Sequence, residues 1–226
     1  MQALVRTEEG GYSNLVLKSQ LARFGGTAQE RAFAAAVFYG TVERKNTLDY
    51  CLGKFLQKPL SRLDAPVRAI LRAGLYQAKY MQSVPVHAAV SESVALCRRM
   101  RKASAAGLVN AVLRRAAAVD VGKETFESET QRLCVQYSVS QPVAELLQRQ
   151  LPAYAERLLA ASFEKPALAV RVNTLRTTPQ ALSAQLAAHG VKARPGRVAN
   201  SLVLEGAGDV AALPEFCSGL FHVQGE

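Results

Sequence analysis

Hydrophobic residues in the first half of the chain recur at helical spacing. Between residues 63 and 81 apolar and small residues recur at i, i+3, i+4, i+7, i+8 and i+11, the spacing of one buried face of an α-helix: Val67, Ile70, Leu71, Gly74, Leu75 and Ala78. Similar segments lie at residues 27–52, 85–102 and 104–118, with short breaks between them. About five helices joined by short loops predict a helical bundle before residue 118.

Capping residues mark where several of these helices begin. Thr27 and Glu30 have the spacing of a capping box, which satisfies free amide groups at a helix start. Asp64 is predicted to be an N-cap, and Pro66 lies in the first turn, where its missing N–H costs nothing. A later segment, SQPVAELLQRQL at 140–151, is also predicted to be a well-capped helix.

The period of the pattern changes after residue 163. A polar linker and a further helical segment lead to Leu168, Val170 and Val172, which alternate with other residues as in a strand. A compact helix follows, with Thr178 as its cap and Gly190 as its stop. Two more short strands, SLVLEG and GLFHVQ, complete a small β-α-β-β unit that looks unfinished.

These patterns predict a mainly α protein in which a helical bundle is followed by a small α+β domain with a short, incomplete sheet. The expected boundaries are residues 1–118 for the bundle, 119–163 for a linker and helical segment, and 164–226 for the α+β domain. The length of 226 residues suits one large domain or two small ones.

Positive charge is concentrated in the first half. Residues 1–120 contain 18 Lys and Arg against 8 Asp and Glu, whereas residues 121–226 contain 10 of each. The whole formal excess of +10 therefore lies in the first half. This asymmetry favours two domains, the first with an anionic partner such as RNA or DNA; a solvated basic surface is the structural alternative.

Several other classes of protein are disfavoured. The longest apolar stretch, AFAAAVFYG, is far shorter than the roughly 18 residues of a membrane span, and charges near the N-terminus argue against a signal peptide. We expect a cytoplasmic protein with no membrane partner. The four cysteines and three histidines are scattered, which predicts reduced thiols and no metal site. No hydrolase or nucleotide-binding motif is present, so no catalytic or cofactor-binding residue is assigned.

The order of several motifs resembles the NusB family of RNA-binding transcription antitermination factors. These motifs are LYQ at 75–77, VPVHAAVSESV at 84–94 and GLVNAVLRR at 107–115; YSNLVL and ERAFAAAVFYGTVERKNTLDY match the earlier helices. The continuation LAVRVNTLRTT, followed by a helix and GLFHVQ, resembles the RsmB family, bacterial methyltransferases that act on carbon 5 of a cytosine in 16S ribosomal RNA.

The resemblance implies a NusB-like RNA-binding fold, 16S rRNA as partner and a ribosomal protein as a further candidate partner. In the RsmB family a Phe-x-Val-Gln-Asp strand leads into a domain with the S-adenosyl-L-methionine site and two catalytic cysteines. Here Gly225 replaces the acidic residue and Glu226 is last. We therefore expect the catalytic domain to lie outside this chain, and no methyl transfer by the chain alone. Cys217, in FCSG, lacks the preceding proline of the family's Pro-Cys and is not assigned as nucleophile.

Basic residues of the first half are the candidates for RNA contacts. Guanidinium groups bind phosphates bidentately, and an aromatic ring can stack on an unpaired base. One run lies at residues 98–102, where helix-dipole compensation explains only part of the charge, and a second set recurs along one helix flank, where solubility is the alternative role. The candidates are Arg98, Arg99, Arg101, Lys102, Arg68, Arg72, Tyr76, Lys79, Arg31, Arg44 and Lys45.

Four polar residues have other expected roles. Glu92 and Asn110 lie in mid-helix among apolar residues and are expected to be buried, bonded to each other or to loop backbone. Arg171 and Asn173 match the Arg-Val-Asn of the RsmB family and contact either RNA or the catalytic domain. Two other functions stay open: a free-standing NusB-like antitermination factor, and a protein-interaction scaffold whose charge is incidental.

Overall fold

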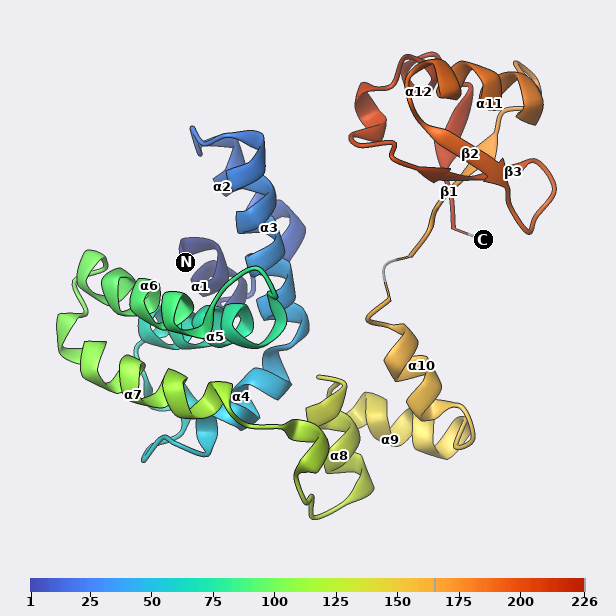
Figure 1. Cartoon of the computed structure of the whole chain (residues 1–226). Coiled ribbons are helices and arrows are strands. Elements are labelled where there is room, and N and C mark those ends of the chain that lie inside the picture. The colour runs from blue at the N-terminus through green and yellow to red at the C-terminus, as the bar shows by residue number, and fades with distance from the viewer. Residues whose placement is uncertain (165, 226) are drawn as a thin grey trace. The chain divides into compact units, whose positions relative to one another are not determined.

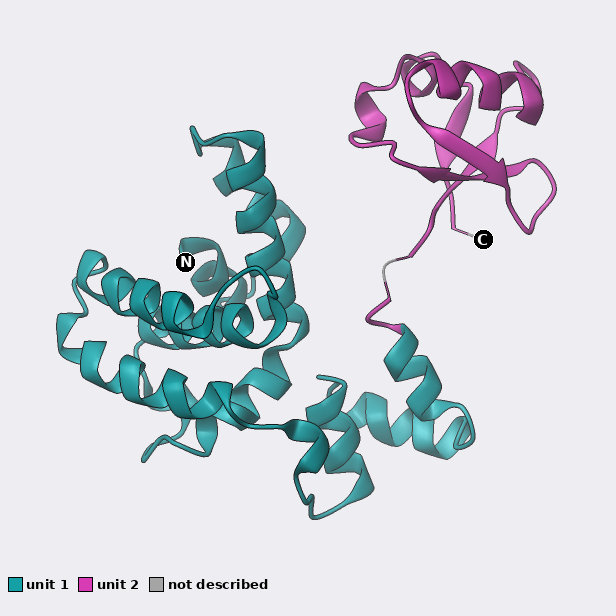
Figure 2. Ribbon diagram, in the orientation of Figure 1, with its two compact units in different colours: residues 1–161 teal, residues 162–226 magenta. Residues whose placement is uncertain are grey.

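The computed structural model describes residues 1–164 and 166–225. The chain forms two compact units, Met1–Ala161 and Ser162–Glu226, which are coloured separately in Figure 2.

The first unit is helical throughout its regular structure (Figure 1). Short 3-10 turns at Leu60–Arg62, Ala103–Ala105 and Val121–Lys123 connect some of its helices. The α-helices described in this unit are α1 (Gln2–Glu8), α2 (Ser13–Ala22), α3 (Ala28–Glu43), α4 (Lys45–Gly53), α5 (Ala65–Tyr80), α6 (Val86–Arg99), α7 (Ala106–Ala117), α8 (Glu129–Gln136), α9 (Gln141–Gln150) and α10 (Ala155–Ala161).

Helix α5 is the centre of this unit, because it is buried on more than one side. Ile70, Leu71 and Leu75 pack into a core with α4, α6 and α7. Ala69 and Ala73 face a second cluster, formed with α1, α2 and α3. The apolar face predicted for this helix is confirmed, but the helix also buries residues outside that face.

The predicted caps have mixed outcomes. The capping box at the start of α3 is confirmed: the Glu30 amide donates to Thr27 Oγ1 at 3.2 Å, and the Thr27 amide donates to Glu30 Oε2 at 2.7 Å. Asp64 occupies the N-cap of α5, but its carboxylate makes no cap hydrogen bond and instead accepts from Lys102 Nζ at 2.6 Å. The helix predicted at residues 140–151 is present as α9, with Ser140 at its N-cap and Pro142 in its first turn, but the Ser140 side chain makes no cap hydrogen bond.

Helices α8 to α10 belong to the first unit, and α8 is fixed to α4 by hydrogen bonds. The Thr47 hydroxyl donates to the carbonyl of Val135 at 2.5 Å, and the Asn46 side-chain amide donates to the carbonyl of Val139 at 2.8 Å. The Asn46 backbone amide donates to Ser138 Oγ at 2.9 Å. Polar side chains of α4 therefore satisfy the backbone at the C-terminal end of α8.

Arg132 of α8 connects this helix to α10 through two carboxylates. Its guanidinium bonds Glu129 at 2.6 Å and Glu156 at 2.8 Å, and the Tyr137 hydroxyl donates to Glu156 at 2.8 Å. The hydrogen bonds from Arg132 first, and then from Tyr137, lower the pKa of Glu156 to about 2. In the unfolded chain this carboxyl titrates near 4.5.

This depressed pKa predicts acid sensitivity in the α8–α10 contact. The ionised carboxylate stabilises the folded unit fully above about pH 4.5, and the contribution is lost as the pH falls toward about 2. We expect the urea midpoint to fall between pH 5 and pH 2.5 by more in the wild type than in Glu156→Gln, which cannot ionise there. Equal falls in the two proteins would contradict this assignment.

The second unit is a four-stranded antiparallel sheet with two α-helices on one of its faces (Figure 1). The strands are β1 (Leu168–Val172), β2 (Lys192–Pro195), β3 (Ser201–Glu205) and β4 (Phe221–Val223), in the order β2-β3-β1-β4. Helix α11 (Pro179–Ala188) follows β1, and the short α12 (Pro214–Cys217) precedes β4. Side chains of β1, β3 and α11 form the core of this unit.

The last strand, β4, pairs with β1 in an antiparallel register. In β4, Val223 lies opposite Val170 and Phe221 opposite Val172, both on β1. The three predicted strands are confirmed, and Thr178 caps α11 by accepting from the Ala181 amide at 3.2 Å. The sequence prediction missed β2, so the described unit has a β-α-β-β-α-β order rather than β-α-β-β.

Candidate nucleic-acid interface

Two arginines of α5 that were candidates for RNA contact are engaged inside the bundle. The guanidinium of Arg72 bonds both carboxylate oxygens of Asp49 on α4, at 2.5 and 2.7 Å, and also bonds Glu8 of α1. Arg68 donates to Glu8 at 2.8 and 2.5 Å and to the carbonyl of Leu63 at 3.0 Å. Arg72 is only 7% exposed, so its interpretation as an RNA-contacting residue is wrong.

The charge of Arg72 is kept by its partners. Burial opposes the ionised form, but hydrogen bonds and charge from Asp49, and then from Glu8, outweigh this effect and raise the pKa of Arg72. These ion pairs tie α1, α4 and α5 together. RNA contact along the α5 flank would require its charged groups to face solvent. The guanidinium groups of Arg68 and Arg72 instead lie against acidic side chains, and the two side chains are only 18% and 8% exposed.

The other two members of the α5 row also pack inward. Tyr76 lies against Gly40 of α3 and stacks on Tyr80, with ring centroids 5.6 Å apart, and burial raises the pKa of its hydroxyl. The ammonium group of Lys79 donates to the carbonyl of Val119. All four side chains therefore serve contacts between parts of the bundle, and RNA contact by the half-buried Arg68, Tyr76 and Lys79 stays a prediction.

The run at residues 98–102 lies at the C-terminal end of α6, at the surface. Arg99 pairs with Glu92 at 3.1 Å, and Lys102 pairs with Asp64 at 2.6 Å. Arg98 and Arg101 are exposed. Surface ion pairs of this kind contribute little to stability, so all four cations remain available to a polyanion.

Arg101 occupies a backbone conformation that side chains disfavour. Its φ is +57°, and the amides of Arg101 and Lys102 donate to the carbonyls of Arg98 and Cys97. This is the Schellman arrangement that ends many helices, in which glycine usually takes the left-handed position. An arginine at this position costs conformational energy that glycine would avoid.

We therefore expect Arg101→Gly to separate stability from binding. Relief of the left-handed strain should raise the free energy of unfolding by about 1 kcal/mol, while removal of the cation should weaken RNA binding. Arg101→Lys is the matched control, since it keeps both the strain and the charge. Urea unfolding and an RNA titration measure the two effects. A variant that is more stable and binds RNA like the wild type would remove Arg101 from the interface.

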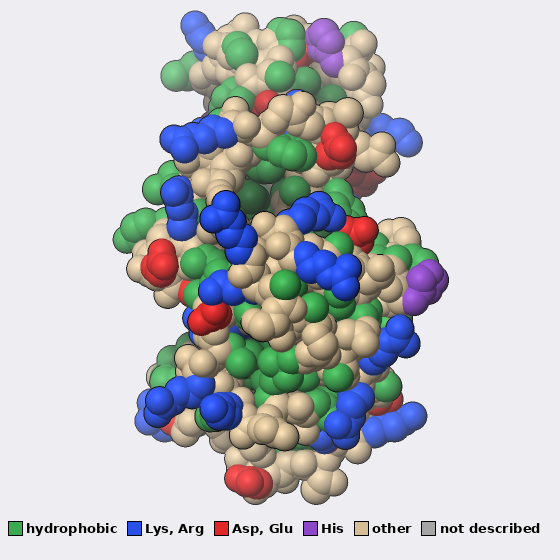
Figure 3. Space-filling model, turned by 90° about the vertical axis from the view of Figure 1, so that its left-hand side faces the viewer, with side chains coloured by type: hydrophobic (Ala, Val, Ile, Leu, Met, Phe, Trp, Pro, Cys, Tyr) green, Lys and Arg blue, Asp and Glu red, His purple; other side chains and the backbone are tan. Residues whose placement is uncertain are grey.

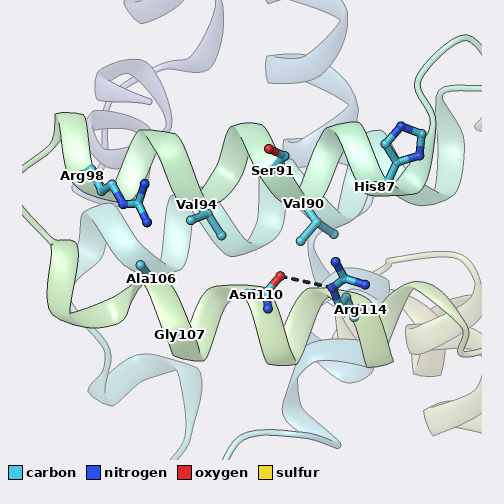
Figure 4. A pocket seen from close by; sticks show the side chains of 9 residues that line it. All are labelled: His87, Val90, Ser91, Val94, Arg98, Ala106, Gly107, Asn110 and Arg114. Atoms are coloured by element: carbon cyan, nitrogen blue, oxygen red, sulfur yellow. Dashed lines mark hydrogen bonds between the residues drawn. The ribbon is translucent and has the colours of Figure 1, made fainter.

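A groove of about 350 Å³ lies beside Arg98, between α6 and α7 (Figure 4). Valines of α6 and Ala106 and Gly107 of α7 form part of its wall. Arg114 of α7 reaches it from the other helix, and its Nε donates to Asn110 Oδ1 at 3.2 Å. His87 and Ser91 of α6 complete the polar lining.

The structure corrects the expectation for the two mid-helix polar residues. Glu92 and Asn110 are exposed, and they bond Arg99 and Arg114 respectively rather than each other. Sequence reasoning also missed Arg114 and His87 as parts of a shared surface. The pair at Arg114 and Arg115 was visible in the sequence, and its spacing from Asn110 and Gly107 on one flank of α7 was the available signal.

The remaining candidates lie on α3 and α4, apart from this groove. Arg31 and Lys45 are exposed, and the guanidinium of Arg44 lies 5.0 Å from the ring centroid of Tyr80. Figure 3 shows one face of the molecule, where Lys and Arg side chains are spread among apolar ones and acidic side chains lie between some of them. Arg31, Arg44 and Lys45 stay candidates for RNA contact.

Within residues 1–164 and 166–225, no group of three potential metal ligands is found. No helix in the described part of the chain is long and apolar enough to cross a membrane. The cysteines are free thiols; Cys51 and Cys97 are buried and Cys217 is exposed, with Sγ 3.4 Å from the carbonyl oxygen of Ala211.

The described residues do not fit an S-adenosyl-L-methionine site. Such sites in open α/β folds lie at the carboxyl ends of parallel strands, beside a glycine-rich turn. All strand pairs described here are antiparallel, and no G-x-G-x-x-G turn follows β1. The exposed cations Arg98, Arg101 and Arg114 are suited to binding an anionic polymer.

Comparison with known families shows to which protein family the helical unit is related. A model of the NusB family matches residues 1–118. The chain belongs to the NusB family. A second model, described as a ferredoxin-like domain of RsmF/B-like methyltransferases, matches residues 143–211, beyond the NusB domain.

Curated relatives of this NusB-family chain carry methyltransferase names. A probable ribosomal RNA small subunit methyltransferase B of Bacillus subtilis is 30% identical over 232 residues, covering 100% of this chain and 51% of the relative. The ribosomal RNA small subunit methyltransferase B of Pseudomonas putida is 33% identical over 199 residues, covering 88% and 45%. The chain thus spans about half the length of the curated relatives it matches.

A solved structure shares the fold. The protein named PH0851 matches 98% of this chain and 51% of its own chain, with a TM-score of 0.68 and 17% sequence identity. At this identity the likeness concerns the fold alone. The family models thus give a NusB domain followed by a ferredoxin-like domain, and they confirm the predicted order of a NusB-like bundle and a small α+β domain.

Proposed function

We propose that this chain is the RNA-binding region of a methyltransferase that modifies carbon 5 of a cytosine in 16S rRNA, with S-adenosyl-L-methionine as methyl donor. The chain holds rRNA so that a flipped cytosine reaches a catalytic domain that the described residues do not contain. The observation that carries this proposal is the basic NusB domain joined to the RsmF/B-like domain in this chain, together with its similarity to relatives named as small subunit rRNA methyltransferases.

The charge distribution supports RNA as the partner. The excess of +10 lies in residues 1–120, and its exposed part includes Arg98, Arg101 and Lys45. Cations at a surface bind phosphates with release of counterions, which makes affinity depend on salt. We assign 16S rRNA as the partner, and a ribosomal protein as a further candidate, in the cytoplasm.

Binding of a 16S rRNA fragment at a series of salt concentrations tests the proposal. If the chain neutralises about five phosphates, log affinity falls against log salt with a slope near −4. Arg98→Glu combined with Arg101→Glu should lower the affinity strongly, whereas Lys192→Glu combined with Arg194→Glu, on the edge strand β2, changes the net charge equally and serves as control. No binding of the fragment, or binding without salt dependence, would refute an RNA-binding role.

A free-standing antitermination factor is the second candidate, and two observations argue against it. Residues 162–226 form a separate compact unit, and residues 143–211 match a methyltransferase-associated domain. A pull-down that recovers an elongation factor or a ribosomal protein, without rRNA, would favour that function instead.

A further inference from the structure

The groove between α6 and α7 has a cation at each end. Figure 4 shows Arg98 at one end, near Ala106, and Arg114 at the other end, near His87. The two arginines come from different helices, and both are exposed. No acidic side chain lines this groove in the part of the chain that the structure describes.

The α7 side of the groove has open space at Gly107. Gly107 has no side chain, and a Cβ atom added there would meet nothing within 4 Å. Polar atoms lie along the same path: the Ser91 hydroxyl, the His87 ring and the Asn110 amide, whose oxygen accepts from Arg114. The bond from Arg114 to Asn110 leaves the terminal nitrogens of the guanidinium for another partner.

We propose that this groove binds the sugar-phosphate backbone of a single RNA strand, with Arg98 and Arg114 holding two phosphates near its ends. The inference rests on the proposed function, because it names the surface at which the RNA is held. The proposal adds three residues to Arg98: Arg114, Asn110 and His87. Arg114 is a contact residue and Asn110 positions it.

The dimensions set the length of strand that the groove holds. Ala106 and Arg114 are eight residues apart on α7, which corresponds to about 12 Å along the helix axis. A stacked strand advances about 3.4 Å per nucleotide, so the stretch of α7 from Ala106 to Arg114 corresponds to about three to four nucleotides. A stacked oligoadenylate of eight nucleotides is long enough to reach both.

A single strand is favoured over an acidic peptide by the chemistry of the lining. Guanidinium groups suit phosphate and carboxylate alike, but hydroxyl, imidazole and amide groups between them match the 2′-hydroxyls that a ribose chain presents. The relatives' names connect this fold to ribosomal RNA. An acidic peptide is therefore treated as an outcome of the test.

A charge placed in the groove gives the sharpest test. Gly107→Glu fills the open space with a carboxylate near the N-terminal end of α7, where an acidic residue suits the helix dipole, so the variant is expected to fold. Ala111→Glu, one turn further on, adds the same charge to the same helix but outside this groove, and it is the matched control. Circular dichroism is used to check that both variants are folded.

We expect Gly107→Glu to bind a fluorescent octaadenylate at least fivefold more weakly than Ala111→Glu. Arg98→Gln and Arg114→Gln should each lower the affinity and reduce the salt slope by about 0.7, the value for one phosphate on a single strand. Equal binding by Gly107→Glu and Ala111→Glu would overturn the inference, as would competition by polyglutamate as effective as by the oligoadenylate.

The same titrations separate the two proposals. If the wild type binds neither the 16S rRNA fragment nor the octaadenylate, the proposed function fails. If it binds the 16S rRNA fragment but the groove variants bind that fragment unchanged, the proposed function stands and the groove is excluded as the contact.

Discussion

Replacing Arg72 with methionine is expected to lower the free energy of unfolding of the helical unit by about 3 kcal/mol. The guanidinium contacts Asp49 and Glu8, and its side chain is only 8% exposed. Methionine fills a similar volume but leaves the two carboxylates partly buried and without this cation. Breaking a buried ion pair from one side costs about 3–5 kcal/mol, and the partial exposure of the carboxylates places this site at the lower end.

Urea unfolding followed by circular dichroism measures this loss, with Arg31→Met as control. Arg31 lies at an exposed position of α3, so the same substitution there should change stability by no more than about 0.5 kcal/mol. Glu8→Gln removes the negative charge that Arg68 and Arg72 share, but it should cost less than Arg72→Met, because Asp49 still pairs with Arg72 and the glutamine oxygen can still accept a hydrogen bond. A loss below 1 kcal/mol for Arg72→Met would mean that desolvation of the ion pairs cancels their attraction.

The contacts that Arg72 makes inside the bundle show what helical spacing can establish. Spacing of i, i+4, i+8 and i+11 correctly places four side chains on one flank of a helix. Whether that flank faces water depends on which helices pack beside it, and Glu8 and Asp49 lie 64 and 23 residues from Arg72. Only folding brings these acidic partners to the arginine.

Local signals were the ones that predicted structure well. The capping box at Thr27 and Glu30 acts within one helical turn, so the sequence contains all of its parts. Strand β2 was missed because its sequence, KARP, has two charges and a proline, and its burial is low. These are features of an edge strand, which resembles a loop in sequence.

The groove shows a second limit. Arg98 and Arg114 belong to separate helices, and they face one groove only because α6 and α7 pack side by side. The basic run at 98–102 and the arginine pair at 114 and 115 were each visible in the sequence. Their combination into one surface depends on the crossing of two helices, which hydrophobic periodicity does not specify.

Gly40→Ala is expected to destabilise the helical unit by up to about 2 kcal/mol, although alanine is the better helix former. A Cβ atom on Gly40 would overlap Cζ of Tyr76, so the ring must move. That movement disturbs its stacking on Tyr80 and the packing of α3 on α5. Overpacking costs about 1–3 kcal/mol, more than the roughly 1 kcal/mol that alanine gains over glycine within a helix.

A double-mutant cycle with Tyr76→Ala tests this cause directly. Once the ring is absent, Gly40→Ala should become stabilising by up to about 1 kcal/mol, because only the helix propensity remains. Gly53→Ala is the control in the wild type, since a Cβ atom there would meet nothing within 4 Å. The sign reversal at residue 40 is the decisive result: if Gly40→Ala destabilises equally with and without Tyr76, the close approach of α3 and α5 does not explain the glycine.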